Sequence, residues 1–434
     1  MQNFLITNGR VIDPGAGTDT VRSIAIAAGR IVDPAQLEND PATTQIDAAG
    51  LVVCPGLVDI HVHFREPGGE YKETIATGTS AAAVGGFTTV VMMPNTIPPI
   101  DSVEIIQKIQ ARVDDTARVH AKITACLTLQ RCGDAIADLR AMARDTAVVA
   151  FTDDGNCVQD EALMLQAATI AAELDIPITD HCEDEKIIAG GVMRQGPEAD
   201  AMQVQGMPGE TESNIVARNI ELSRRTGAHF HMQHLSSAVS IEHMRRAKAD
   251  GIRVTAEVTP HHLALTVADV PTLGSSAKMN PPLGTAADRQ ALLEALADGT
   301  IDAIATDHAP HAPWEKAGNF AAAPFGVLGL ETALSVSLTT LYHTGIVDLP
   351  ELVRLMTLAP ARLLRLDAGT LAVGAVADVT LFDPDAELVV DITTSGSRSR
   401  NSPFHGRTVR GAVAATMCSG AWVYKAPTFD NPSA

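Results

Sequence analysis

Histidines and acidic residues directly follow short apolar runs in this 434-residue chain, where they could bind metal ions. The first apolar run, Leu57–His63, contains His61 and His63 and is followed by Arg65. Because a β-strand sends alternate side chains to opposite faces, the two imidazoles point the same way. An H-x-H pair alone is weak evidence for a metal site, since such pairs also occur by chance.

Further residues of metal-ligand type follow four other apolar runs, namely Asp153 with Asp154, His181, His234 and Asp307. The carboxyl ends of the strands in a closed parallel barrel surround one cavity, so these side chains would converge there. Four imidazoles with two carboxylates suit a pair of Zn²⁺ or similar ions, bridged by a carboxylate and completed by water. His231 is the alternative to His234. The remaining histidines are expected to be packing, supporting or surface groups.

A barrel is the architecture that the alternation of segments predicts. Between the apolar runs lie helical patterns over Asp160–Leu174, Thr211–Arg225 and Ala287–Ala297, which indicates βα units and a parallel sheet. Eight strands, the number that closes a TIM-type (β/α)8 barrel, are expected. They are Leu57–His63, Thr88–Met93, His120–Thr124, Ala147–Phe151, Ile176–Thr179, His229–Gln233, Arg253–Val258 and Ile301–Thr306.

The two ends of the chain differ from its middle. Residues 1–55 and 366–434 contain short apolar runs separated by turn residues such as Asn8-Gly9 and Asp13-Pro14-Gly15. Chain ends often lie close together, so both ends are predicted to form one small β-sandwich domain. The barrel would then occupy residues 56–365, giving an α/β catalytic domain with a composite β domain.

Composition narrows the function classes. With a net charge of -20, the chain has no basic surface for nucleic acid or an anionic membrane. The N-terminus lacks a basic segment followed by an apolar one, so no signal peptide is expected there, and the uncharged stretch 78–100, which is broken by Gly and Pro, is not expected to span a membrane. The six cysteines are scattered without C-x-x-C pairs, which predicts a cytoplasmic protein.

Eight short motifs follow one another along the chain and carry a family resemblance. They are D-I-H-V-H-F-R-E-P-G (59–68), M-M-P-N-T (92–96), F-T-D-D-G (151–155), D-H-C-E-D (180–184), H-L-S (234–236), K-M-N-P-P-L (278–283), A-T-D-H-A-P-H (305–311) and P-F-G-V-L-G-L-E-T (324–332). In this order they resemble the class I dihydroorotases of the amidohydrolase superfamily. The resemblance covers essentially the whole chain.

This resemblance implies reversible ring closure of N-carbamoyl-L-aspartate to L-dihydroorotate in pyrimidine biosynthesis. One zinc ion would be held by His61, His63 and Asp307, and a second by His181 and His234. Asp154 would bridge the two ions, with Asp153 as the alternative. A carboxylated Lys122, the kind of bridge found in many members of the superfamily, is improbable here because the chain has the Asp-Asp pair.

The mechanism that follows uses a water whose pKa the metal lowers to about 7. Asp307, the catalytic residue, would carry the proton between this water and the ring nitrogen. Arg65 would bind the substrate carboxylate in a planar, two-pronged manner. The other substrate contacts implied by the family are His63, Asn95, Asn280, His311 and the backbone around Phe325 and Gly326. The stretch 309–324 is either a mobile lid or a surface excursion.

Two other functions are compatible with these residues. An allantoinase or hydantoinase would share the fold and the metals, whereas Arg65 and the two asparagines favour a substrate with a ring carboxylate. A non-catalytic scaffold for aspartate transcarbamoylase would be expected to lack metal ligands, and here every expected position is filled. A homodimer and an association with aspartate transcarbamoylase are further expectations.

Overall fold

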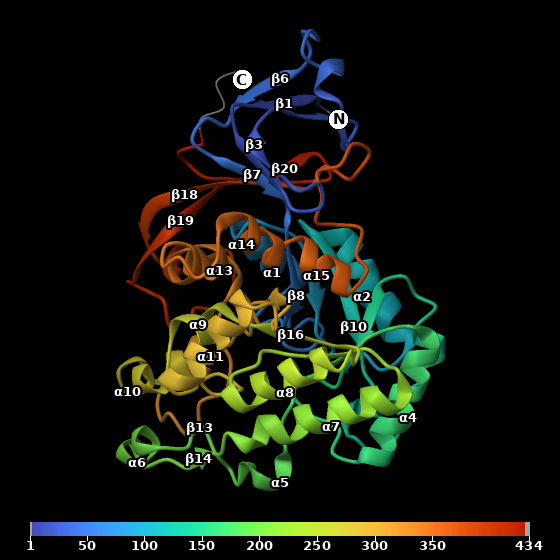
Figure 1. Cartoon of the computed structure of the whole chain (residues 1–434), viewed down its shortest axis with the longest axis vertical. Helices are drawn as coiled ribbons and strands as arrows, with labels where there is room; N and C mark the ends of the chain where they lie inside the picture. The colour runs from blue at the N-terminus through green and yellow to red at the C-terminus, as the bar shows by residue number, and fades with distance from the viewer. Residues whose placement is uncertain (1, 430–434) are drawn as a thin grey trace.

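Eight parallel strands form the centre of the molecule in the computed structural model, which describes residues 2–429 (Figure 1). They occur in the order in which they follow along the chain, and each predicted strand is present with ends within two residues of those expected. The strands are β8 (Leu57–Val62), β9 (Phe87–Met92), β10 (His120–Ala125), β11 (Val148–Phe151), β12 (Ile178–Asp180), β15 (Phe230–Met232), β16 (Val254–Val258) and β17 (Ala303–Ile304).

The sheet curls so that its last strand returns to its first. Val62 in β8 pairs in parallel with His308, which lies just beyond β17, and the His63 amide donates to the His308 carbonyl at 2.9 Å. The Thr306 amide also donates to the Asp59 carboxylate, at 3.1 Å. These bonds join the two edges, so the predicted TIM-type barrel is confirmed, and the carboxyl ends of its strands surround one cavity.

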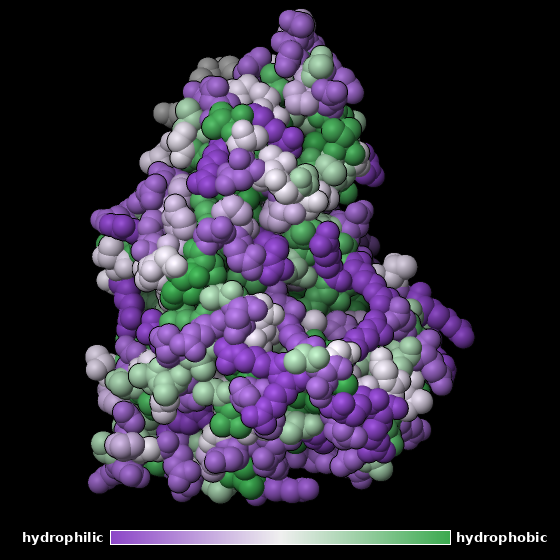
Figure 2. All heavy atoms as spheres, viewed as in Figure 1, coloured by the Kyte–Doolittle hydropathy of each residue, from purple (hydrophilic) through white to green (hydrophobic). Residues whose placement is uncertain are grey.

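Helices cover the outside of the barrel as the sequence predicts. The three expected helices are α4 (Glu161–Leu174), α7 (Glu210–Thr226) and α11 (Ala286–Ala297). In α4, Asp160 caps the Leu163 amide, and the buried residues recur at helical spacing. Figure 2 shows that hydrophilic residues cover most of the outer face over α7 and α8 (Ala238–Ala249). No helix within residues 2–429 is both long and apolar enough to cross a membrane.

A β-sandwich built from strands near both ends of the chain sits beside the barrel (Figure 1). Its first sheet contains β5 (Arg30–Val32), β4 (Ile24–Ala27), β1 (Phe4–Thr7) and β6 (Thr44–Asp47). Its second sheet contains β20 (Ala421–Lys425), β19 (Thr408–Cys418), β18 (Val379–Val389), β7 (Val52–Pro55), β2 (Arg10–Asp13) and β3 (Thr18–Val21). Their inner faces share a core that includes Phe4, Val11, Leu381 and Met417.

The C-terminal segment also reaches the barrel. β18 and β19 form a long hairpin whose register shifts between Asp383 and Glu387, around Pro384. The hairpin packs against α13 (Ala333–Ser337), and the connection between its strands brings Asn401 to the carbonyls of Ala309 and Gly326. The domain boundary at residue 366 therefore stays a prediction, since part of the C-terminal segment contacts the catalytic end of the barrel.

Candidate metal centre

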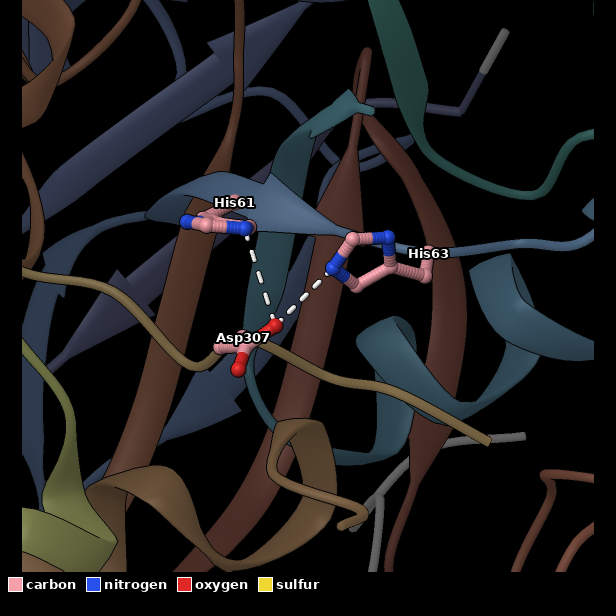
Figure 3. A group of neighbouring side chains, drawn as sticks. All are labelled: His61, His63 and Asp307. Carbon is pink, nitrogen blue, oxygen red and sulfur yellow. Dashed lines mark hydrogen bonds and ion pairs between the residues drawn. The ribbon is translucent and has the colours of Figure 1, made fainter. Parts of the chain in front are cut away.

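His61, His63 and Asp307 meet at the carboxyl end of the barrel (Figure 3). The alternation of β8 places both histidines on its inner face, and Asp307 comes from the loop after β17. The His63 Nε2 lies 2.9 Å and the His61 Nε2 3.6 Å from the same oxygen of Asp307. All three residues are buried. Two nitrogens and one oxygen thus converge on one point.

Asp154 lies beside this group, between it and two further histidines. Its carboxylate oxygens are each 3.5 Å from a ligand nitrogen, one from the His61 Nε2 and the other from the His63 Nε2. The His181 Nδ1 lies 4.0 Å from Asp154 and 2.9 Å from the His234 Nε2. His61, Asp154 and His234 form a second group of potential ligands. The structure therefore brings all six expected ligands together.

The two adjacent aspartates face different surroundings. The Asp153 carboxylate accepts bonds from the amides of Leu127 and Thr128, at 2.8 and 3.1 Å, and from the Thr128 hydroxyl. It thus fixes the loop after β10 and is turned away from the histidines. Lys122 donates to the Thr146 carbonyl at 3.3 Å and does not line the cavity. This arrangement favours Asp154 over both alternatives as the bridging group.

Burial and neighbouring charges set the ionisation of these groups. Burial opposes ionisation of the Asp154 carboxyl, but the imidazoles around it, His61 above all, hold its pKa well below the usual range. Burial and the adjacent imidazoles of His181 and His61 hold the pKa of His234 well below its usual value. An ionised carboxylate beside a neutral imidazole is the form in which both bind metal ions.

Glu257 is a functional residue that sequence reasoning missed. It lies in β16, is 1% exposed, and accepts a bond from the His61 Nδ1 at 2.7 Å and from the His231 Nε2 at 3.1 Å. His231 therefore supports Glu257 and does not replace His234. A carboxylate on the far nitrogen of an imidazole fixes the tautomer and turns the other nitrogen toward a metal. The available signal was a single acidic residue in a strand that is otherwise uncharged.

The donor set fits divalent metal ions. With its Nδ1 engaged by Glu257, His61 presents a buried Nε2 that has no hydrogen-bond partner among residues 2–429. An unpaired buried nitrogen is costly, and a metal ion would satisfy it. Imidazole nitrogens and carboxylate oxygens in two groups of three are ligands that Zn²⁺ accepts. The geometry therefore supports a metal centre here.

A cavity of about 210 Å³ opens over the two groups and contains all the expected substrate contacts. Its lining includes His63, Arg65, Asn95, Asn280, His311, Phe325 and Gly326. The Asn95 side-chain oxygen accepts a bond from the His63 Nδ1 at 2.9 Å. Asn280 donates to Glu183 at 2.6 Å and to the His181 Nε2 at 3.2 Å, which adds Glu183 to the residues that the sequence did not indicate.

The wall opposite the metal ligands is built from positively charged and neutral groups. Burial lowers the pKa of Arg65, yet the guanidinium stays charged and donates to the Pro310 carbonyl at 3.3 Å. Burial and the nearby Arg65 and Lys72 lower the pKa of His311 to about 2, so its imidazole is neutral. The His311 Nε2 donates to the Phe325 carbonyl at 2.6 Å. This wall suits an anionic group of a ligand.

The segment 309–324 is tied down along its length. The buried Lys316 at the end of α12 (Pro313–Lys316) donates to the carbonyls of Lys278 and Pro324, at 3.0 and 2.8 Å. Asn401 binds the Ala309 carbonyl at 3.0 Å, and Trp314 stacks on Tyr71. These contacts favour a fixed wall of the cavity over a mobile lid.

Comparisons with known proteins agree with this geometry. A family model described as dihydro-orotase-like matches residues 50–240. The dihydroorotase of Bacillus licheniformis is 45% identical over 98% of both chains, and that of Shouchella clausii is 43% identical over 98% of this chain and 99% of its own. Among solved structures, the L-hydantoinase from Arthrobacter aurescens superposes with a TM-score of 0.87 at 26% identity, over 98% of this chain and 96% of that one.

The barrel with its ring of histidines and carboxylates, together with these relatives, defines a cyclic amide hydrolase of the amidohydrolase type. Identity of 43–45% over nearly the full length places the chain more narrowly. It belongs to the dihydroorotase family.

Proposed function

We propose that this protein catalyses the reversible ring closure of N-carbamoyl-L-aspartate to L-dihydroorotate. The observation that carries the proposal is the convergence of six potential metal ligands with Arg65 in one cavity. Metal ions held by these ligands would assist attack on an amide, and Arg65 would bind a carboxylate of the substrate. A dihydroorotate ring carries both groups.

Two zinc ions are proposed as cofactors, with His61, His63 and Asp307 at one, His181 and His234 at the other, and Asp154 between them. When bound, such ions supply Lewis acidity that lowers the pKa of a coordinated water and polarises a carbonyl oxygen. The neutral His234 and the ionised Asp154 are ready to act as ligands without first changing their protonation state. Glu257 keeps the His61 Nε2 directed at the centre.

Asp307 is the proposed acid and base. During hydrolysis its carboxylate takes the proton of the attacking water and delivers it to the departing ring nitrogen. During cyclisation the protonated carboxyl helps to remove a substrate carboxylate oxygen as water. The His63 Nε2 lies 2.9 Å from an Asp307 oxygen, so the carboxylate stands beside the proposed ligands at the edge of the cavity.

The substrate would be oriented by the opposite wall. Arg65 offers its planar guanidinium to the substrate carboxylate, while Asn95 after β9 and Asn280 in the connection between β16 and β17 present amide groups. The neutral His311 and the backbone at Phe325 and Gly326 would contact the ring amide. Gly326 has a φ of +127° and lies so close to Ala309 that a side chain would collide there.

The test compares dihydroorotate, allantoin and hydantoin as substrates of one preparation. We expect hydrolysis of dihydroorotate and cyclisation of N-carbamoyl-L-aspartate, with little turnover of the two rings that lack a carboxylate. Faster turnover of hydantoin or allantoin would contradict the assigned role of Arg65. Absence of any activity with a fully metal-loaded protein would favour the scaffold function instead.

Assembly stays a prediction of the family resemblance, and cellular location stays a prediction from the sequence. Homodimer formation and association with aspartate transcarbamoylase can both be tested by size-exclusion chromatography with light scattering, with and without that enzyme. A cytoplasmic location rests on the scattered cysteines, all six of which are free thiols in the structure.

A further inference from the structure

A second cluster of potential metal ligands lies at the opposite end of the barrel strands. His120 is the first residue of β10, Asp378 immediately precedes β18, and Cys418 is the last residue of β19. One ligand thus comes from the barrel and two come from the sandwich, so the cluster lies where the two parts meet. It shares no residue with the catalytic centre, which lies at the carboxyl ends of the strands.

The geometry of this cluster resembles a metal site with one position left for water. The His120 Nε2 lies 3.1 Å from one Asp378 oxygen and 3.3 Å from the other. All three ligand atoms, including the Cys418 sulfur, lie within 4.8 Å of one another. Bond lengths of about 2.0–2.3 Å around a tetrahedral zinc ion separate the ligand atoms by roughly 3.3–3.7 Å. Only small side-chain movements would therefore admit the ion.

The burial of the three side chains fits a metal site that is open to solvent on one side. Asp378 and Cys418 are buried, at 5% and 7% exposure, whereas the His120 side chain is 39% exposed. The Asp378 Oδ1 is held by the Ser419 amide at 2.8 Å, which fixes the carboxylate and leaves its Oδ2 facing His120. The Asp378 carboxylate is thus preorganised, and the exposed imidazole leaves a path from solvent.

The electrostatic surroundings favour a cation at this point. The Asp378 carboxylate places negative charge 3.1 Å from the His120 Nε2. A metal ion bound here would displace the thiol proton of Cys418 to solvent. Thiolate and imidazole together are ligands that select zinc over magnesium or calcium.

We propose that His120, Asp378 and Cys418 form a structural zinc site that joins the barrel to the β-sandwich. The fourth ligand is a water molecule from the solvent side. The competing interpretation is a plain His120–Asp378 ion pair beside a free thiol, whose sulfur lies 3.8 Å from the Thr88 carbonyl. The two interpretations differ in whether a thiolate–metal bond exists.

Cobalt substitution distinguishes them, because a thiolate bound to Co²⁺ gives a near-ultraviolet charge-transfer band and the catalytic centre contains no cysteine. The protein is stripped of metal and loaded with excess Co²⁺, and bound cobalt is counted after desalting. We expect the band in the parent protein and in the control C132S, which removes an exposed thiol. We expect it to be absent from C418S, with one fewer cobalt ion per chain.

H120Q is the second variant. His120 is partly exposed, so its replacement should leave the fold intact, whereas a serine at the buried position 418 could disturb β19. Circular dichroism checks the fold of each variant. The band should be lost or shifted in H120Q, with about one ion fewer retained after desalting. A parent protein without the band, or a band that persists unchanged in C418S, would overturn the proposal.

Discussion

Replacing Glu257 with glutamine should weaken metal binding at the catalytic centre without removing any proposed metal ligand. Glu257 is fully enclosed in the barrel and touches the imidazoles of His61 and His231. Burial opposes its ionisation, but these imidazoles lower the pKa of Glu257 to about 2, so the carboxylate is charged at neutral pH. Glutamine has nearly the same shape, but it removes the charge and replaces one of the two accepting oxygens by an NH2 donor.

The size of the effect follows from the two hydrogen bonds. A bond to a charged group contributes about 1.5–3 kcal/mol and a bond between neutral groups about 0.5–1.5 kcal/mol, so glutamine loses one of the two bonds and weakens the other by about 1 kcal/mol. For the bond that orients His61 the loss is thus between about 1 and 3 kcal/mol, and its middle value of about 2 kcal/mol corresponds to a roughly 30-fold change in an equilibrium constant. Replacing a residue that hydrogen-bonds to a metal-bound histidine typically lowers the affinity for the metal by about 10–100-fold, a range that includes this value.

The assay is a competition for Zn²⁺ between the protein and a chromophoric chelator, with hydrolysis of dihydroorotate measured on the same samples. Excess zinc should restore much of the lost activity in E257Q. The control is E331Q, which alters a largely buried carboxylate that accepts bonds from Ser395 and the Gly396 amide. An affinity for zinc that is unchanged in E257Q, or reduced equally in E331Q, would refute the argument.

Three other perturbations test other parts of the site. R65K should raise the KM for dihydroorotate roughly tenfold with kcat little changed, because lysine cannot form the two parallel bonds of arginine; an unchanged KM would contradict the assignment. Cyclisation should become slower and hydrolysis faster as pH rises, since Asp307 must be protonated for one and ionised for the other; rates independent of pH in both directions would exclude this role. G326A should destabilise the protein by about 1–3 kcal/mol in urea unfolding, since the new Cβ would lie 2.7 Å from the Ala309 Cβ at a φ of +127°; wild-type stability would contradict the geometry.

The barrel strands could be predicted because they are buried on both faces and therefore appear as short apolar runs. Strand β3, Thr18–Val21, could not, because it is polar and largely exposed and forms only by pairing with β2. The continuous hairpin of β18 and β19 could not be predicted either, because β18 contains Pro384. It lies where the register of β18 shifts, which a proline tolerates.

The positions of the candidate ligands could be predicted for a similar reason, since each follows a strand that points at the same cavity. The residues that support these ligands and the cavity wall could not be predicted. Which imidazole Glu257 meets depends on how β16 lies beside β15 and one strand away from β8, and no local pattern encodes that pairing. Asn401 reaches the cavity wall from the far end of the chain, through a connection that the sequence assigned to the small domain.

The central claim is that histidines and carboxylates from distant strands bind metal ions that enable ring closure. The most direct measurement is metal content and N-carbamoyl-L-aspartate cyclisation on a single preparation, before chelation, after chelation and after return of Zn²⁺. The measurement uses C418S, which lacks the proposed structural site, so that only ions at the catalytic centre are counted. The account predicts up to two ions per chain, loss of cyclisation when they are removed, and recovery when zinc returns. Full activity in protein stripped of metal would contradict it.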